Sequence, residues 1–143
     1  MKSALLGMTL TAVAPLAAAQ IANFDSDAPD QPPAGWKIDR GGRWKDGDNY
    51  YVARANALEN NVSLYYTRNG TRNTLKYVDA PVKTGKWHEL IVEFAGPRIQ
   101  VILDGYQYID FQDTHITGGG AAGVWTKADS VTEFDDFQVE TAK

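Results

Sequence analysis

The chain has 143 residues, no cysteine and a formal net charge of −4. Without cysteine it has no disulfide framework, no thiolate metal site, no thiol nucleophile and no lipid-modified cysteine. The negative charge argues against nucleic acid or an anionic membrane surface as a partner, because both require basic patches. Arg68 and Arg72 flank Asn69-Gly70 and are interpreted as a solvated hairpin tip. A neutral or weakly charged ligand therefore fits the composition better.

The first 19 residues have the pattern of a secretory signal peptide. Lys2 supplies a positive charge, residues 4–13 are apolar, and residues 17–19 form a small-residue cleavage signature. A membrane anchor is the weaker alternative, because the apolar run is shorter than the roughly 20 residues of a spanning helix. We expect cleavage before Gln20 and a periplasmic or extracellular location without membrane insertion. The mature chain, residues 20–143, is long enough for one hydrophobic core and is expected to form a single, monomeric domain.

The mature chain consists of short strand patterns separated by turn residues, and no helical period is sustained over three turns. Residues 26–35 contain three prolines and are predicted as a loop. Asn69-Gly70, Gly96-Pro97 and Asp104-Gly105 are signals for tight turns. The expected strands are 21–25, 36–38, 42–45, 50–54, 62–67, 74–78, 87–94, 99–103, 106–111, 123–125 and 134–139. About ten short strands of this kind predict an all-β sandwich or barrel in one domain.

The clearest alternation lies in the strand 87–94. Leu90, Val92 and Phe94 fall on one face of it, and the residues between them fall on the other. The same alternation continues in 99–103. This pattern is typical of half-buried strands in an antiparallel sheet.

The closing stretch 121–139 is predicted as two short strands, joined by a polar turn, that complete the sandwich. Its acids Glu133, Asp135 and Asp136 form the densest carboxylate cluster of the chain, and paired carboxylates are what glycoside hydrolysis needs. On a strand, however, Glu133 and Asp135 share a face with Phe137, while Asp136 points the other way. This split favours a structural role, such as capping a turn or pairing with a surface lysine, over catalysis.

His88 and His115 are the two histidines of the chain. They lack the close spacing of zinc ligands, and no cysteine accompanies them. No nucleophile-elbow motif supports a Ser-His-Asp arrangement. The sequence therefore disfavours a catalytic role for either histidine, and it assigns no catalytic residue.

Two stretches resemble known sandwich families. GKWHELIVEFAGPRIQVILDG is similar to the centre of laminin-G-like and concanavalin A-like domains, where a tryptophan opens a strand and a hairpin ends in Asp-Gly. GVWTKADSVTEFDDFQV, with YYVARANAL upstream, resembles the bacterial 3-keto-disaccharide hydrolase-like family. The resemblance runs from Phe24 to Val139 and implies a two-sheet antiparallel jelly-roll sandwich whose concave face holds a saccharide. It leaves activity open, because such families include both glycan-processing enzymes and binding domains.

The resemblance also implies a structural calcium ion between the N-terminal and C-terminal segments. Asp25, Asp27 and Asp136 offer oxygen ligands for such a site. The alternative is that Asp135 and Asp136 only cap a turn or pair with a surface lysine, since calcium needs six or more oxygen ligands, which the sequence does not assign.

A sugar-binding surface is expected beside Trp125. If Val124 faces the core, Trp125 faces outward, and an exposed indole offers a flat apolar surface to a sugar ring. A few polar groups placed around it would orient a polyol. The candidate ligand-binding residues are Arg54, Asn56, Tyr65 or Tyr66, Trp125, Lys127 and Asp129. The alternative places Trp125 in the core and pairs Lys127 with Asp129 on the surface.

Three functions remain open from the sequence. The first is a secreted carbohydrate-binding domain that holds a saccharide on its concave sheet. The second is a glycoside hydrolase acting on a sugar derivative, which requires two titratable groups converging on one ligand atom. The third is a structural or envelope-associated domain, which requires an exposed apolar patch or an uncovered strand edge.

Overall fold

The computed structural model describes residues 20–22, 49–127 and 130–140, and the predicted strands 36–38 and 42–45 lie outside them. Every element of the described part is a strand, so the predicted all-β class is confirmed. No helix that could cross a membrane is found among these residues. The strands are β1 (Gln20–Ala22), β2 (Tyr50–Asn56), β3 (Asn61–Arg68), β4 (Thr71–Asp79), β5 (Leu90–Ala95), β6 (Arg98–Leu103), β7 (Tyr106–Gln112) and β8 (Phe137–Val139).

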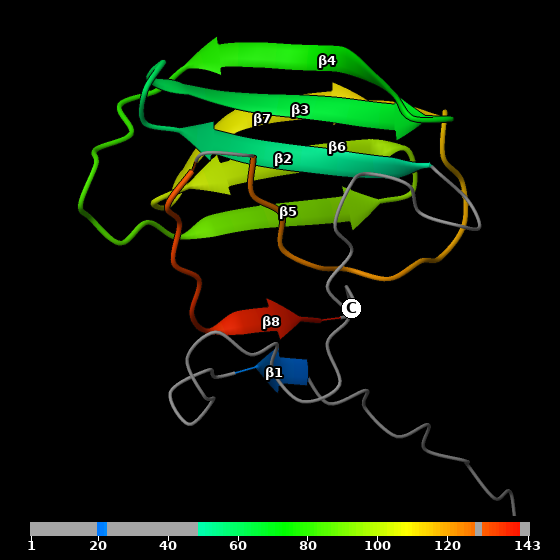
Figure 1. The fold of residues 1–143 in the computed structure, drawn as a ribbon. Helices are drawn as coiled ribbons and strands as arrows, with labels where there is room; N and C mark the ends of the chain where they lie inside the picture. Colours follow the sequence, from blue (N-terminus) through cyan, green and yellow to red (C-terminus); the bar gives the residue numbers. More distant parts are fainter. Residues whose placement is uncertain (1–19, 23–48, 128–129, 141–143) are drawn as a thin grey trace, which may run out of the picture.

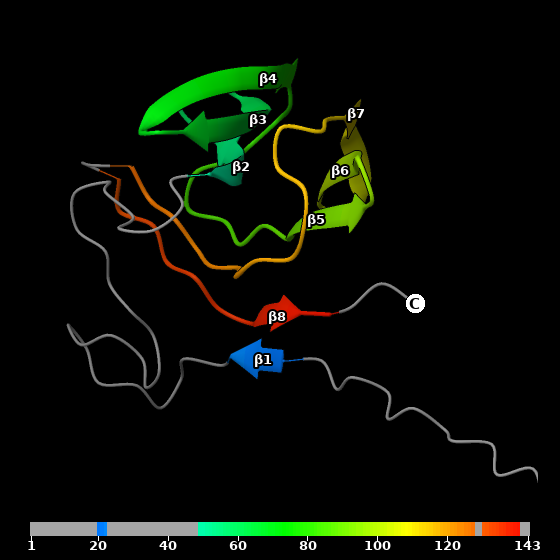
Figure 2. The ribbon, with the colours of Figure 1, turned by 90° about the vertical axis from the view of Figure 1, so that its right-hand side faces the viewer.

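Two antiparallel sheets of three strands face each other, with the orders β2-β3-β4 and β5-β6-β7 (Figures 1 and 2). In each sheet, neighbours in sequence are neighbours in space, because tight turns join them. The β3–β4 turn has Asn69 and Gly70 at φ 51° and 74°, and the β6–β7 turn has Asp104 and Gly105 at φ 50° and 77°. Two successive positive φ values are the signature of the hairpin turn predicted for Asn-Gly and Asp-Gly. The arrangement is the two-sheet antiparallel sandwich expected from the sequence.

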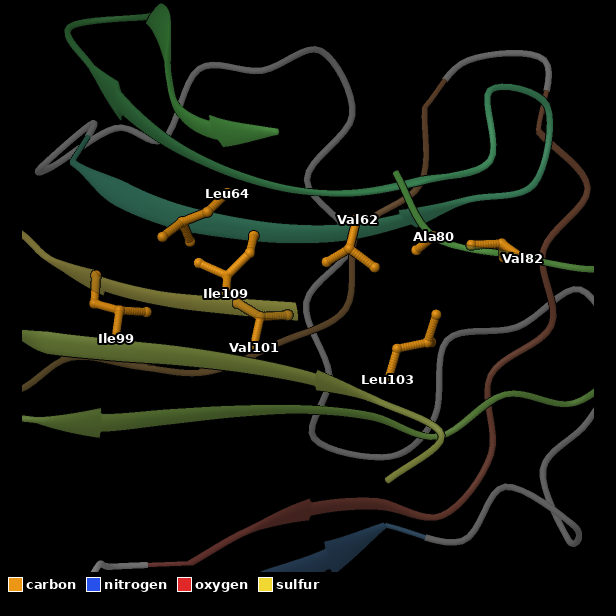
Figure 3. Close-up of a cluster of buried hydrophobic side chains, with 8 residues drawn as sticks. All are labelled: Val62, Leu64, Ala80, Val82, Ile99, Val101, Leu103 and Ile109. Carbon is orange, nitrogen blue, oxygen red and sulfur yellow. The ribbon is translucent and has the colours of Figure 1, made fainter. Parts of the chain in front are cut away.

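The core lies between these two sheets (Figure 3). Alternate residues of β6, Ile99, Val101 and Leu103, are buried, as the sequence pattern predicts. They meet side chains of the facing sheet and of the connection that follows β4. The buried cluster comprises Val62, Leu64, Ala80, Val82, Ile99, Val101, Leu103 and Ile109. Burying each of the larger aliphatic side chains contributes about 1.5–3 kcal/mol to folding.

The closing stretch differs from the prediction. Residues 123–125 form no strand, and the last strand begins only at Phe137. Asp136 has φ 50°, which interrupts an extended chain immediately before β8. Further upstream, the glycine-rich run at 118–123 lowers the strand propensity of the chain around residues 123–125. The predicted alternation of Glu133, Asp135 and Asp136 on a strand is therefore wrong.

β8 also pairs differently from the expectation that it completes the sandwich. Within the described residues its partner is β1, with Ala22 opposite Phe137 and Gln20 opposite Val139. This two-stranded sheet lies apart from the two main sheets in both views (Figures 1 and 2). The partner of β8 is thus the segment that follows the predicted cleavage site.

Candidate functional site

The β2-β3-β4 sheet has a second, polar face that points away from the core. Tyr51, Ala53 and Ala55 of β2 pack against the core, so the residues between them lie on the opposite side. The register extends this assignment across the sheet, since paired residues share a face. We call this side the outer face. It comprises Tyr50, Val52, Arg54, Asn56, Asn61, Ser63, Tyr65, Thr67, Arg72, Thr74, Tyr77 and Asp79.

A pocket of about 400 Å³ opens at one end of the outer face, beside the β3–β4 turn. Trp125 reaches it from the segment after β7, drawn in orange in Figure 1, which returns to this sheet. The remaining walls come from all three strands. The pocket is lined by Tyr50, Val52, Tyr65, Thr67, Gly70, Arg72 and Trp125. Three aromatic side chains with a few polar groups form the kind of lining that binds small polar ligands.

Arg72 and Tyr65 are in direct contact in this pocket. The guanidinium carbon of Arg72 lies over the Tyr65 ring, 4.8 Å from its centroid. A cation in this position is attracted by the negative face of the ring, which contributes about 0.5–1 kcal/mol at an exposed site. The Tyr65 side chain is buried beneath it, whereas Trp125 remains 43% exposed. The indole is therefore available to a ligand.

The middle and far end of the outer face contain two buried polar atoms that lack a hydrogen-bond partner within the described chain. The Asn61 Oδ1 and Ser63 Oγ atoms are buried and have no hydrogen-bond partner among the described residues. The Asn61 amide nitrogen, by contrast, donates to the Tyr77 hydroxyl at 2.5 Å and to Glu59 at 3.2 Å. Buried polar atoms without partners are rare in folded proteins and cost about 1–3 kcal/mol each.

The structure separates the predicted ligand-binding residues. Tyr65 and Trp125 line the pocket, and Arg54 lies on the same face, opposite Ser63. Asn56 is buried at the far end, where its amide donates to Glu59 at 2.8 Å and holds the β2–β3 turn. That assignment stays a prediction.

Three further candidates lie elsewhere or outside the described part. Tyr66 is on the core-facing side and stacks on the His115 ring at 4.1 Å between centroids. Lys127 is exposed two positions after Trp125, and Asp129 lies outside the described residues.

Sequence reasoning missed five residues of the pocket lining: Tyr50, Val52, Thr67, Gly70 and Arg72. A signal for two of them was present, because the Asn69-Gly70 turn fixes the register that places Thr67 opposite Arg72. An arginine interpreted as part of a solvated turn therefore belongs to the pocket.

His88 is held on both ring nitrogens. Its Nδ1 lies 2.7 Å from Asp104 Oδ2, and its Nε2 lies 2.9 Å from the Lys83 carbonyl oxygen. Both partners are acceptors, so the doubly protonated imidazolium satisfies them best. The hydrogen bonds to Asp104 and Lys83 accordingly raise the pKa of His88, and the same bond to His88 lowers the pKa of Asp104. The His88 side chain thus connects the segment before β5 to the β6–β7 turn.

Asp113 ties the two sheets together at the end of β7. Its buried carboxylate accepts hydrogen bonds from the Tyr51 hydroxyl, the His115 backbone at 2.8 Å and the His115 Nδ1 at 2.7 Å. Burial raises the pKa of Asp113, but these hydrogen bonds outweigh it and hold the pKa below its usual value. Burial and the bond to Asp113 raise the pKa of Tyr51. This network joins β2 to the segment after β7.

The acidic residues of the closing stretch are exposed and dispersed. Asp135 accepts a hydrogen bond from the Asp136 backbone at 2.8 Å, which is a local turn contact. Asp136 belongs to the predicted calcium site, whereas Asp25 and Asp27 lie outside the described residues. Within the part of the chain that the structure covers, no three His, Asp or Glu side chains gather as metal ligands. The calcium site stays a prediction.

Fold and site together define an all-β sandwich with an open aromatic pocket on the outer face of one sheet. The comparisons with known proteins give one structure similar to it, the carbohydrate-binding module CBM66 from Bacillus subtilis. The two are 26% identical, over 48% of this chain and 43% of the module, with a TM-score of 0.47. The matched part thus spans less than half of that module. No family model matches the chain, and no curated protein matches it.

Proposed function

We propose that this protein binds a saccharide in the pocket on the outer face of β2-β3-β4. The observation that carries the proposal is the juxtaposition of exposed Trp125 with Tyr65 and Arg72 in one open pocket. The indole offers a stacking surface to the apolar face of a sugar ring, and the guanidinium offers donors to its oxygens. An open site of this kind suits a polymer chain as well as a single sugar.

Hydrolysis of the sugar has less support in the geometry. Glycoside hydrolysis needs two carboxyl groups flanking the scissile bond. None of the described residues that line the pocket is Asp or Glu. His88 is engaged at both ring nitrogens on the other sheet. Binding without turnover is thus the function that these residues favour.

Exposed apolar side chains near the edge strand β5 support the alternative of a structural or envelope-associated domain. Trp87, which precedes the edge strand β5, is 68% exposed, and Phe94, which lies in that strand, is 50% exposed. Exposed apolar side chains on a sheet edge are a means of recruiting a partner. Replacement of Trp87 is therefore a suitable control for replacement of Trp125 in binding experiments.

Export remains part of the proposal, as does the calcium ion held by Asp25, Asp27 and Asp136. Cleavage before Gln20 would leave β1 whole, because this strand begins at Gln20. A carbohydrate-binding protein outside the cytoplasm would meet polysaccharides there.

A glycan array, followed by product analysis on the glycans that bind, tests the proposal directly. We expect retention of at least one class of glycan and no release of reducing ends or smaller sugars. Release of products would establish the hydrolase alternative. Failure to bind any glycan would contradict the proposal itself.

A further inference from the structure

The pocket has a positive charge although the chain as a whole is acidic. Of the described residues that line it, Arg72 is the charged one. Arg54 lies on the same face beyond Val52, and Lys127 follows Trp125 by two positions. Among the described residues, the acids near this face, Glu59 and Asp79, lie at the opposite end, around Asn61. A ligand in the pocket thus meets cationic side chains in a chain with 18 acidic and 14 basic residues.

Arg72 has no acidic partner in the part of the chain that the structure describes. The ion pairs there are formed by His88, Arg98 and His115. Arg98, on the outer face of the other sheet, shows what a paired arginine looks like. Its Nε and Nη2 atoms donate to the two carboxylate oxygens of Asp110 at 2.8 and 2.5 Å. Arg72 presents the same fork of donors without a carboxylate in it.

The position of Arg72 suits a carboxylate from outside. Stacking over the Tyr65 ring restrains the guanidinium, and no ion pair within the described residues occupies its N–H donors. An arginine fork matches the two oxygens of a carboxylate, and such charge-assisted pairs are among the strongest hydrogen bonds in proteins. Trp125 borders the same pocket, so a ring stacked on the indole can place a ring substituent near Arg72.

We infer that the saccharide is a uronate, a sugar whose ring carries a carboxylate, and that Arg72 binds this carboxylate while Trp125 binds the ring. The inference rests on the proposed function and specifies its ligand class. It departs from the neutral ligand that the net charge of the chain favours, because local charge at a site, rather than net charge, sets recognition at short range.

The test uses acidic polysaccharides together with their neutralised forms. Binding of the intact protein to polygalacturonate, alginate and hyaluronate is measured by affinity electrophoresis and calorimetry, in parallel with the same polymers after methyl esterification. We expect at least one acidic polymer to bind about tenfold more tightly than its ester, and this difference to shrink as salt is added.

Two arginine variants localise the effect. Arg72→Gln is expected to weaken binding of the acidic polymer about tenfold and binding of the ester by a smaller factor, because only the acidic polymer loses a hydrogen-bonded charge pair, whereas the Gln amide can still donate to oxygens of the ester. Arg98→Gln removes the same charge from the other sheet and is expected to bind like the wild type. Unchanged thermal unfolding midpoints confirm that both variants fold.

Each remaining outcome counts against a defined part of the inference. Equal or tighter binding of the esters would overturn the uronate and leave saccharide binding intact. Equal loss in both arginine variants, or equal competition by dextran sulfate, would show general attraction of anions and overturn the role of Arg72. Failure of all these polymers and of the neutral glycans on the array would overturn the proposed function as well.

Discussion

The outer faces of the two sheets differ in how their polar side chains are paired. On β5-β6-β7, Arg98 binds Asp110 and Gln100 donates to Gln107, so the face satisfies its own polar groups. On β2-β3-β4, Arg72 has no acidic partner and Ser63 Oγ has no partner at all within the described chain. Both faces belong to sheets of the same size that bury the same core between them.

This difference separates folding from recognition. A face that completes its own hydrogen bonds gains nothing further from a polar ligand, whereas a face with an exposed guanidinium that has no acidic partner among the described residues, such as that of Arg72, gains hydrogen bonds on binding. Natural proteins accept such local costs where function requires them. The pairing therefore singles out β2-β3-β4 as the binding sheet, in agreement with the position of its pocket.

Replacing Trp125 is expected to have the largest effect. Trp125→Ala removes the exposed stacking surface, and we expect binding of the glycan identified on the array to weaken by about 2 kcal/mol, or roughly 30-fold. Thermal unfolding should change little, because the side chain is 43% exposed. Affinity electrophoresis and a thermal scan on the same preparation measure both quantities.

Trp87→Ala is the matched control, since its indole is 68% exposed at the other sheet. It should bind as the wild type does. Loss of binding in Trp87→Ala with retention in Trp125→Ala would move the site to the β5 edge, and a large fall in stability of Trp125→Ala would assign that indole to the core.

The sandwich could be predicted from the sequence where alternation and turn signals coincide. The predicted strands 50–54, 62–67 and 99–103 match β2, β3 and β6 within two residues at each end. Their pairing is local and their turns are specified by Asn-Gly, Gly-Pro and Asp-Gly. The closing strand was mispredicted because its partner, β1, is more than a hundred residues away, so no local pattern could indicate it.

The pocket was predictable only in part. Trp125 and Tyr65 were singled out as aromatic candidates, and the structure brings them together. Their proximity depends on the path of residues 113–127, which carry no hydrophobic period from which a path could be derived. The difference between Tyr65 and Tyr66 depends on strand phase, and only the register settles which of them faces outward. Placing Arg72 in the pocket likewise depends on the register of the β3–β4 hairpin.

Ser63 provides a second, smaller contrast between the faces. Its buried hydroxyl has no hydrogen-bond partner in the part of the chain that the structure describes, so Ser63→Ala should raise the free energy of unfolding by about 1 kcal/mol, a shift of roughly 4 °C in the midpoint. Gln100→Ala on the other outer face removes a paired amide and should leave stability unchanged or lower it by about 0.5 kcal/mol. Differential scanning calorimetry of both variants tests the contrast, which a destabilised Ser63→Ala would contradict.

The smallest expected effect is a pH dependence of stability that arises at the β5-β6-β7 sheet, through His88. The hydrogen bonds to Asp104 and Lys83 raise the pKa of His88 above the 6.5 of the free side chain. The stabilisation is therefore complete below pH 6.5 and declines as the pH rises through the higher folded pKa. Asp104 has a lowered pKa, so it stays charged throughout this range. Because Asp104 is half exposed, we expect a loss of only about 0.5 kcal/mol between pH 6 and pH 8.5.

Urea unfolding of the wild type and His88→Gln at several pH values isolates this contribution. His115 is the other histidine of the chain and is present in both proteins, so any contribution from it cancels in the difference. The wild type should lose its advantage over the variant as the pH rises, whereas glycan binding should stay constant, since none of the described residues lining the pocket is His, Asp or Glu. A stability difference that is independent of pH would show that His88 acts through packing alone. A parallel change in glycan binding would show that the two outer faces are coupled. It would contradict the separation between them that we infer from the pairing of their side chains.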